Sequence, residues 1–173
     1  MNKTTKAYKI AYMGILFALS IALSFLEGLI PLDAVLIPGA KLGLSNIVTM
    51  YALFFLGAPK ALVIAVLKSG FVFLMRGPVA FTLSVCGGII SVAVMSLLFY
   101  CFKAKSYFVL SVFGAVFHNV GQIVAATVVL GNVKVLYYFP ILFVSGIVMG
   151  VLTALVLKII IPYIKKFQFI DKK

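Results

Sequence analysis

Three hydrogen-bonding side chains interrupt the nearly unbroken apolar run SVFGAVFHNVGQIVAATVVL at residues 111–130. They are His118, which is the single histidine of the chain, Asn119 and Gln122. Spacings of three and four residues place all three on one face of a helix. Polar side chains at membrane depth face the protein interior, so this face predicts either hydrogen bonds between helices or a ligand-binding surface.

Two of the three cations in another apolar segment, residues 59–76, lie beyond its start. Lys68 lies near its middle and Arg76 ends it, whereas we expect Glu27 and Asp33 on a loop at another depth. A buried lysine without a carboxylate partner has to snorkel, lose its proton or meet an external anion. We therefore predict that Lys68 and Arg76 receive an anionic group of a ligand.

Small and hydroxyl-bearing residues mark the segment FTLSVCGGIISVAVMSL. Ser84, Gly87, Gly88 and Ser91 offer a close approach to the backbone together with hydroxyl groups. Two interpretations stay open, since tight helix packing and a ligand wedged against the helix both need such a smooth surface.

The first apolar segment carries a stripe of small residues. Ala7, Ala11, Gly14, Ala18 and Ala22 recur at spacings of three and four, which keeps them on one helical face. Such faces are common contact surfaces between helices in lipid. The stripe predicts either packing inside this bundle or docking of a separate membrane subunit.

The composition is that of an integral membrane protein. Of 173 residues, 65% are hydrophobic and 10% charged, and the mean hydropathy is +1.27. The apolar runs are long enough for helices, and they lack the ten-residue alternation of a membrane barrel. The net charge of +12 comes from basic residues scattered beside these runs, without the clustered patch that binds nucleic acid.

The apolar pattern predicts an all-α bundle of about six transmembrane helices in a single domain, residues 1–173. The predicted segments are 8–27, 43–57, 59–76, 79–102, 107–130 and 138–161. The second and third are short and separated only by GAPK, so they form either two full crossings or a tilted hairpin. The distribution of lysines favours cytoplasmic N- and C-termini. The connection at residues 27–46, on the outer side, is unusually apolar, so it is interpreted either as a lid over a site or as a packed structural connection.

The chain lacks the residues that several kinds of catalytic and metal sites need. Three acidic residues, none of them paired, are too few for the magnesium sites of a diphosphate-handling enzyme. The chain also contains no P-loop, no GxSxG motif and no second histidine for a metal site. We therefore expect a protein that is not an enzyme and uses neither metal nor cofactor.

Three motifs in order carry a family resemblance: PGAKLGLSNIVTMYALFFLG at 38–57, then FTLSVCGGIISVAVMSLL, then GAVFHNVGQIVAA. With them the chain resembles the Gx transporter family, whose members are often labelled heptaprenyl diphosphate synthase component I. The family usually carries an arginine where this chain has Lys68. The positive charge is retained, but a lysine cannot bind an anion through the bidentate hydrogen bonds that an arginine makes. The synthase label conflicts with the missing acidic residues.

That family in turn resembles the substrate-binding S components of energy-coupling-factor transporters. The resemblance implies a six-helix membrane protein with a long outer loop over its site. It also implies docking of a transmembrane coupling subunit, which works with ATPase subunits, on small residues of the first helix. Ala18 and Ala22, or Ala11 with Gly14, match that role.

The sequence thus predicts a substrate-binding subunit in a bacterial plasma membrane that captures a small anionic or amphipathic ligand from the outer side. The alternative is a non-catalytic scaffold or lipid-handling subunit of isoprenoid or quinone metabolism. The expected binding residues are Lys41, Asn46, Lys68, Arg76, His118, Asn119 and Gln122, with Ser84, Gly87, Gly88 and Ser91 as further lining residues.

Overall fold

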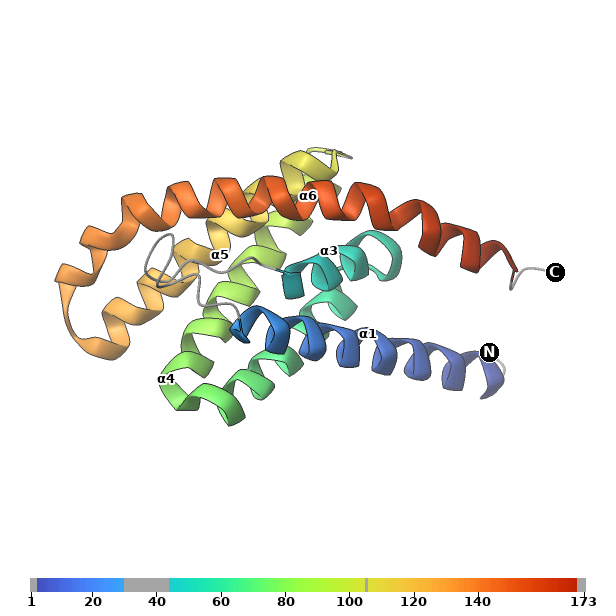
Figure 1. Cartoon of the computed structure of the whole chain (residues 1–173), viewed down its shortest axis with the longest axis horizontal. Helices are drawn as coiled ribbons and strands as arrows, with labels where there is room; N and C mark the ends of the chain where they lie inside the picture. The colour runs from blue at the N-terminus through green and yellow to red at the C-terminus, as the bar shows by residue number, and fades with distance from the viewer. Residues whose placement is uncertain (1–2, 30–43, 105, 171–173) are drawn as a thin grey trace.

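The computed structural model describes residues 3–29, 44–104 and 106–170, and all regular secondary structure in these ranges is helical. The elements are α1 (Lys3–Leu29), α3 (Leu44–Leu56), α4 (Ala58–Tyr100), α5 (Tyr107–Leu130), the 3-10 helix η1 (Val133–Tyr138) and α6 (Phe139–Ile170). Figure 1 shows a bundle in which the short α3 lies between α1 and α6, with the start of α1 and the end of α6 at the same end. The predicted all-helical architecture is confirmed.

Helix α4 is a hairpin rather than a straight rod. Gly77 interrupts it with φ 82° and ψ −176°, a backbone conformation that favours glycine, and Pro78 follows without an N–H to continue the ladder. The hydroxyls of Ser69 and Ser84 are 2.9 Å apart, although a straight helix would separate residues 15 positions apart by about 22 Å. The two halves of α4 therefore run antiparallel, as the sequence predicts for 59–76 and 79–102.

The centre of the core is α3. All residues from Ile47 to Leu53 are buried, and the Tyr51 hydroxyl lies 2.6 Å from the Tyr12 hydroxyl of α1. The described helix has 13 residues and measures about 20 Å, which is shorter than a hydrocarbon core of ~30 Å. It is a buried core helix, and a sixth complete crossing of the membrane stays a prediction.

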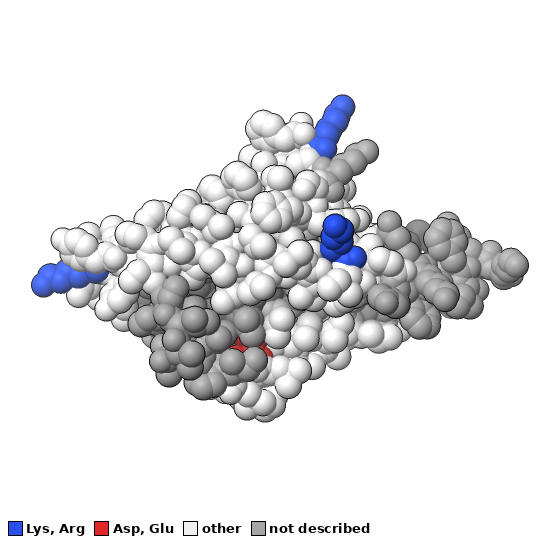
Figure 2. Space-filling model, turned by 45° about the horizontal axis from the view of Figure 1, so that its top comes forward, with Lys and Arg blue, Asp and Glu red and all other residues white. Residues whose placement is uncertain are grey.

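The outer surface suits lipid. Within the described ranges, four helices are long enough and apolar enough to cross a membrane, and one of them is the folded α4. Large apolar side chains point away from the bundle, among them Leu74, Val128 and Ile10. In Figure 2 the lysine and arginine side chains of the described residues stand apart from one another on a mostly uncharged face, and an acidic group shows near its centre. A surface of this kind is stable only in an apolar surrounding.

The helix ends agree with the predicted ones in part. The predicted bounds of α5, 107–130, are the observed ones: Ser106 caps its start by accepting from the Val109 N–H at 3.5 Å, and Gly131 ends it with φ 60°. The first helix is longer than the predicted 8–27, so Glu27 belongs to α1 and not to a loop. The connection at 30–43, with Lys41, lies outside the described residues, and its role as a lid stays a prediction.

Glycines bring α5 into direct backbone contact with α4. A Cβ atom placed on Gly121 would lie 2.9 Å from both the Gly87 Cα and the Cys86 carbonyl oxygen. A Cβ on Gly87 would lie 2.8 Å from the His118 carbonyl oxygen. The backbone atoms that meet here cannot rotate away, so glycine at both positions sets the distance between the helices.

We expect Gly121→Ala to lower the melting temperature of the purified protein in detergent, by an amount that corresponds to about 1–3 kcal/mol of overpacking. Gly70→Ala is the matched control, because a Cβ on Gly70 meets nothing within 4 Å. Equal melting temperatures for the two variants would contradict the contact between α4 and α5.

Candidate functional site

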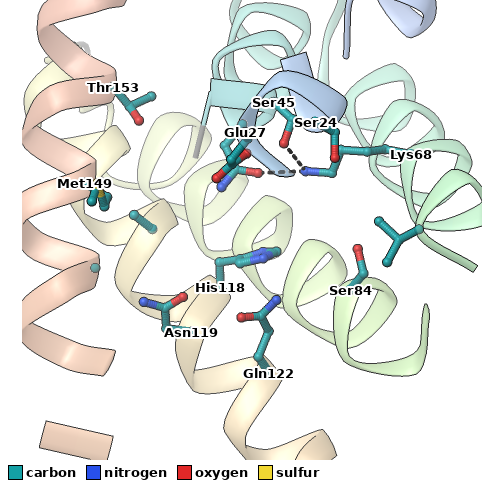
Figure 3. Close-up of a pocket in the computed structure, with 14 residues that line it drawn as sticks. Ser24, Glu27, Ser45, Lys68, Ser84, His118, Asn119, Gln122, Met149 and Thr153 are labelled. Atoms are coloured by element: carbon teal, nitrogen blue, oxygen red, sulfur yellow. Dashed lines mark hydrogen bonds between the residues drawn. The ribbon is translucent and has the colours of Figure 1, made fainter. Parts of the chain in front are cut away.

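A polar pocket of about 50 Å³ lies inside the bundle, where five helices meet. Its lining consists of Ser24 and Glu27 from α1, Ser45 and Asn46 from α3, Lys68, Val72 and Ser84 from α4, Ala115, His118, Asn119 and Gln122 from α5, and Gly146, Met149 and Thr153 from α6. Figure 3 shows the labelled side chains arranged around this space. Segments far apart in the sequence thus place polar groups in one cavity.

The ammonium group of Lys68 is fixed by the first turn of α3. Its Nζ donates to Asn46 Oδ1 at 2.9 Å and to Ser45 Oγ at 3.1 Å, as the dashed lines in Figure 3 mark. Only 5% of the Lys68 side chain is exposed. The lysine therefore does not snorkel to the surface. Asn46, which we predicted to bind ligand, also positions this cation.

A carboxylate lines the same pocket, contrary to the prediction. We expected Glu27 on a loop at another depth from Lys68, but it lies in the last turns of α1, and 8% of its side chain is exposed. The prediction failed because the helix continues to Leu29, which carries Glu27 into the bundle. Lys68 thus shares its pocket with an acidic group of the same chain.

The polar face of α5 forms one wall of the pocket, where His118, Asn119 and Gln122 all line the cavity. Asn119 also ties two helices together: its Nδ2 donates to the Leu142 carbonyl of α6 at 2.8 Å and lies 3.4 Å from Ser145 Oγ. Asn119 therefore makes a hydrogen bond between helices, as one of the two interpretations expects, while its role in ligand binding stays a prediction. One end of its amide holds α6, and the residue still borders the cavity.

The four small and hydroxyl residues of α4 divide between packing and lining. Ser84 lines the polar pocket. Gly87 contacts α5, whereas the hydroxyl of Ser91 donates to the Gly114 carbonyl at 2.7 Å. Gly88 faces Ala65 across the α4 hairpin. Gly88 and Ser91 border smaller cavities of about 10 Å³ beside the pocket, and their closest described contacts are between helices.

Arg76 borders a second, larger cavity of about 170 Å³. This cavity shares Ser24, Glu27 and Val72 with the polar pocket, and its other walls include apolar side chains such as Phe71. A Cβ on Gly28 would lie 3.4 Å from Arg76 Nη2, which places the guanidinium beside the end of α1. Arg76 and Lys68 thus border neighbouring cavities that share three lining residues, and their joint action on one anionic group stays a prediction.

The prediction missed the wall that α1 contributes. Ser20, Ser24 and Glu27 recur at spacings of four and three, which places them on one helical face. Ser20 and Glu27 are buried, and Ser24 and Glu27 line the pocket. A polar stripe opposite the small-residue stripe was therefore present in the sequence. We did not predict this stripe as a pocket wall, because we expected Glu27 on a loop.

Residues 16–160 match the family model described as Heptaprenyl diphosphate synthase component I. The chain belongs to this family. The matched range contains every described residue of the polar pocket. No curated protein and no solved structure matches the chain. In the part of this family member that the structure describes, no three His, Cys, Asp or Glu side chains are grouped so that they could hold a metal ion.

We expect Asn119→Ala to lower the melting temperature of the ligand-free protein by the equivalent of about 1 kcal/mol, because it removes the hydrogen bond that joins α5 to α6. Gln122→Ala is the control on the same face, and we expect it to cost less stability. If the Gln122 variant melts as low as the Asn119 variant, the bond to Leu142 does not carry the difference.

Proposed function

We propose that this chain is a membrane-embedded binding subunit that captures a small ligand with an anionic group in the polar pocket. The observation that carries this proposal is the ammonium of Lys68, buried and oriented by Ser45 and Asn46 at the wall of a cavity. Ionised side chains at membrane depth are costly, and they mark ligand or ion sites. An anionic group in the pocket would receive the field of a cation that is already in place.

The larger cavity is the proposed route to the pocket. It lies beside Arg76 and the end of α1, whereas the opposite end of the bundle brings Gly57 near the Tyr100 hydroxyl. Lys60 and Lys103 flank that opposite end, which by the positive-inside rule is the cytoplasmic one. The ligand would then arrive from the outer side, where the Arg76 guanidinium attracts anions toward the opening.

The cavity volumes support a ligand with two parts. The polar pocket of about 50 Å³ is far smaller than the ~300–1,000 Å³ of typical small-molecule sites. It holds a head group, which His118 and Gln122 orient by hydrogen bonds. The remainder would extend into the cavity of about 170 Å³, whose walls include Phe71 and Met75.

The outer face of α1 is the proposed docking surface for a transmembrane coupling subunit, with ATPase subunits beyond it. Ala11, Gly14, Ala18 and Ala22 are all exposed, and a Cβ on Gly14 would meet nothing within 4 Å. The small stripe therefore does not pack inside this bundle, which leaves lipid or a partner helix against it. Docking on this stripe is what the resemblance to S components implies for a bacterial plasma membrane protein.

A scaffold or lipid-handling subunit of isoprenoid or quinone metabolism is the second candidate. The small volume of the polar pocket and the use of Asn119 as a tie to α6 favour it, since both suit a bundle that is packed to be rigid. The two candidates differ in whether a small molecule remains in the purified protein.

We expect native mass spectrometry of the full chain, purified gently from its own membranes, to show a bound small molecule that Lys68→Met loses. Lys158→Met is the matched control, because Lys158 is exposed on α6 and touches neither cavity. A wild-type protein without any bound molecule favours the scaffold. Equal retention by the Lys68 and Lys158 variants contradicts the role of Lys68.

We expect Ala18→Leu to abolish co-purification of the coupling subunit while the bound small molecule is retained, because the added volume holds the partner helix away. Ala93→Leu makes the same change on an exposed position of α4 and serves as the control. Undiminished recovery of the coupling subunit with the Ala18 variant would remove the docking role of the stripe.

A further inference from the structure

We infer that the pocket contains a subsite for a cationic group at Glu27, so that the ligand is a zwitterion with an ammonium-like group beside Glu27 and an anionic group beside Lys68. This inference rests on the proposed capture of a ligand in the polar pocket. It assigns the chemical class of that ligand, which the anion-binding role of Lys68 leaves open.

Glu27 lies where the two cavities join. It borders both the polar pocket and the larger cavity, and its side chain is 8% exposed. A ligand that passes from the larger cavity into the pocket therefore passes this carboxylate. Figure 3 shows Glu27 across the same space from His118 and Gln122.

Among the described residues that line the pocket, one can carry a positive charge, Lys68, and one a negative charge, Glu27. Lys68 and Glu27 supply the charges, His118 is the remaining titratable group on its described walls, and Arg76 stands apart in the larger cavity. At low dielectric, a charge on either side chain acts on a group in the pocket across several ångströms. The ligand therefore meets a negative and a positive wall at once.

Charge matching selects between ligand classes. A ligand with only an anionic group gains from Lys68 but is repelled by Glu27, and a ligand with only a cationic group meets the reverse. A neutral ligand gains little from two ionised side chains that are costly to keep at this depth. A zwitterion places each of its charges beside the opposite one, and it alone gains from both walls.

The test measures binding of matched probes to the full chain in detergent by isothermal titration. The probes are the ω-amino acids from glycine to 6-aminohexanoate, each compared with the carboxylate and the primary amine of the same chain length. We expect at least one amino acid to bind about ten-fold more tightly than its carboxylate and its amine. Glu27→Gln should remove this preference while it leaves the carboxylate affinity unchanged or higher.

Lys68→Met, by contrast, should weaken the amino acid and the carboxylate alike. If the carboxylate binds wild type as tightly as the amino acid does, the cationic subsite is overturned while the proposed anion capture stands. If neither the carboxylates nor the amino acids bind, the proposed capture itself is overturned. A preference for the amino acid that survives in Glu27→Gln places its ammonium elsewhere and also overturns the inference.

Discussion

A charged ammonium cannot stay inside an apolar bundle unless the protein supplies its hydrogen bonds, and the centre of this structure follows from that requirement. The acceptors come from Ser45 and Asn46, which belong to the first turn of α3. Helix α3 therefore has to lie deep enough for this turn to reach Lys68. The burial of its residues from Ile47 to Leu53 holds it there, and the other helices pack around it.

Small residues make the close approach of these helices possible. Lipid tails are as apolar as leucine, so the helices are held by van der Waals packing and by hydrogen bonds between them rather than by the hydrophobic effect. Gly87 and Gly121 allow α4 and α5 to touch, and Gly150 lets α6 approach the backbone at Val112. Hydroxyls of Ser91 and Ser111 then reach carbonyls of neighbouring helices at 2.7 Å. This packing leaves only a small polar space inside.

The sequence patterns within one helix predicted the features that depend on that helix alone. The bounds of α5 were predicted from its apolar run, and the shared face of His118, Asn119 and Gln122 from helical periodicity. What depends on several helices could not be predicted. Spacing does not show that Asn119 reaches Leu142, that Ser84 meets Ser69, or that Glu27 joins Lys68 in one pocket. The end of α1 was predicted at residue 27 instead of Leu29, so Glu27 was expected on a loop and its place in the pocket was not predicted.

Helix α1 joins the inside of the molecule to its outside. One of its faces carries Ser24 and Glu27 toward the pocket, and the opposite face exposes Gly14 and Ala18. A continuous helix is stiff along its length, so a sideways push on the outer face moves the inner face as well. Any neighbour that displaces α1 by an ångström shifts the Glu27 carboxylate by a similar amount, against a Lys68 ammonium that α3 keeps still. A contact on the lipid-facing side of α1 that displaced the helix would thus change the electric field in the buried cavity.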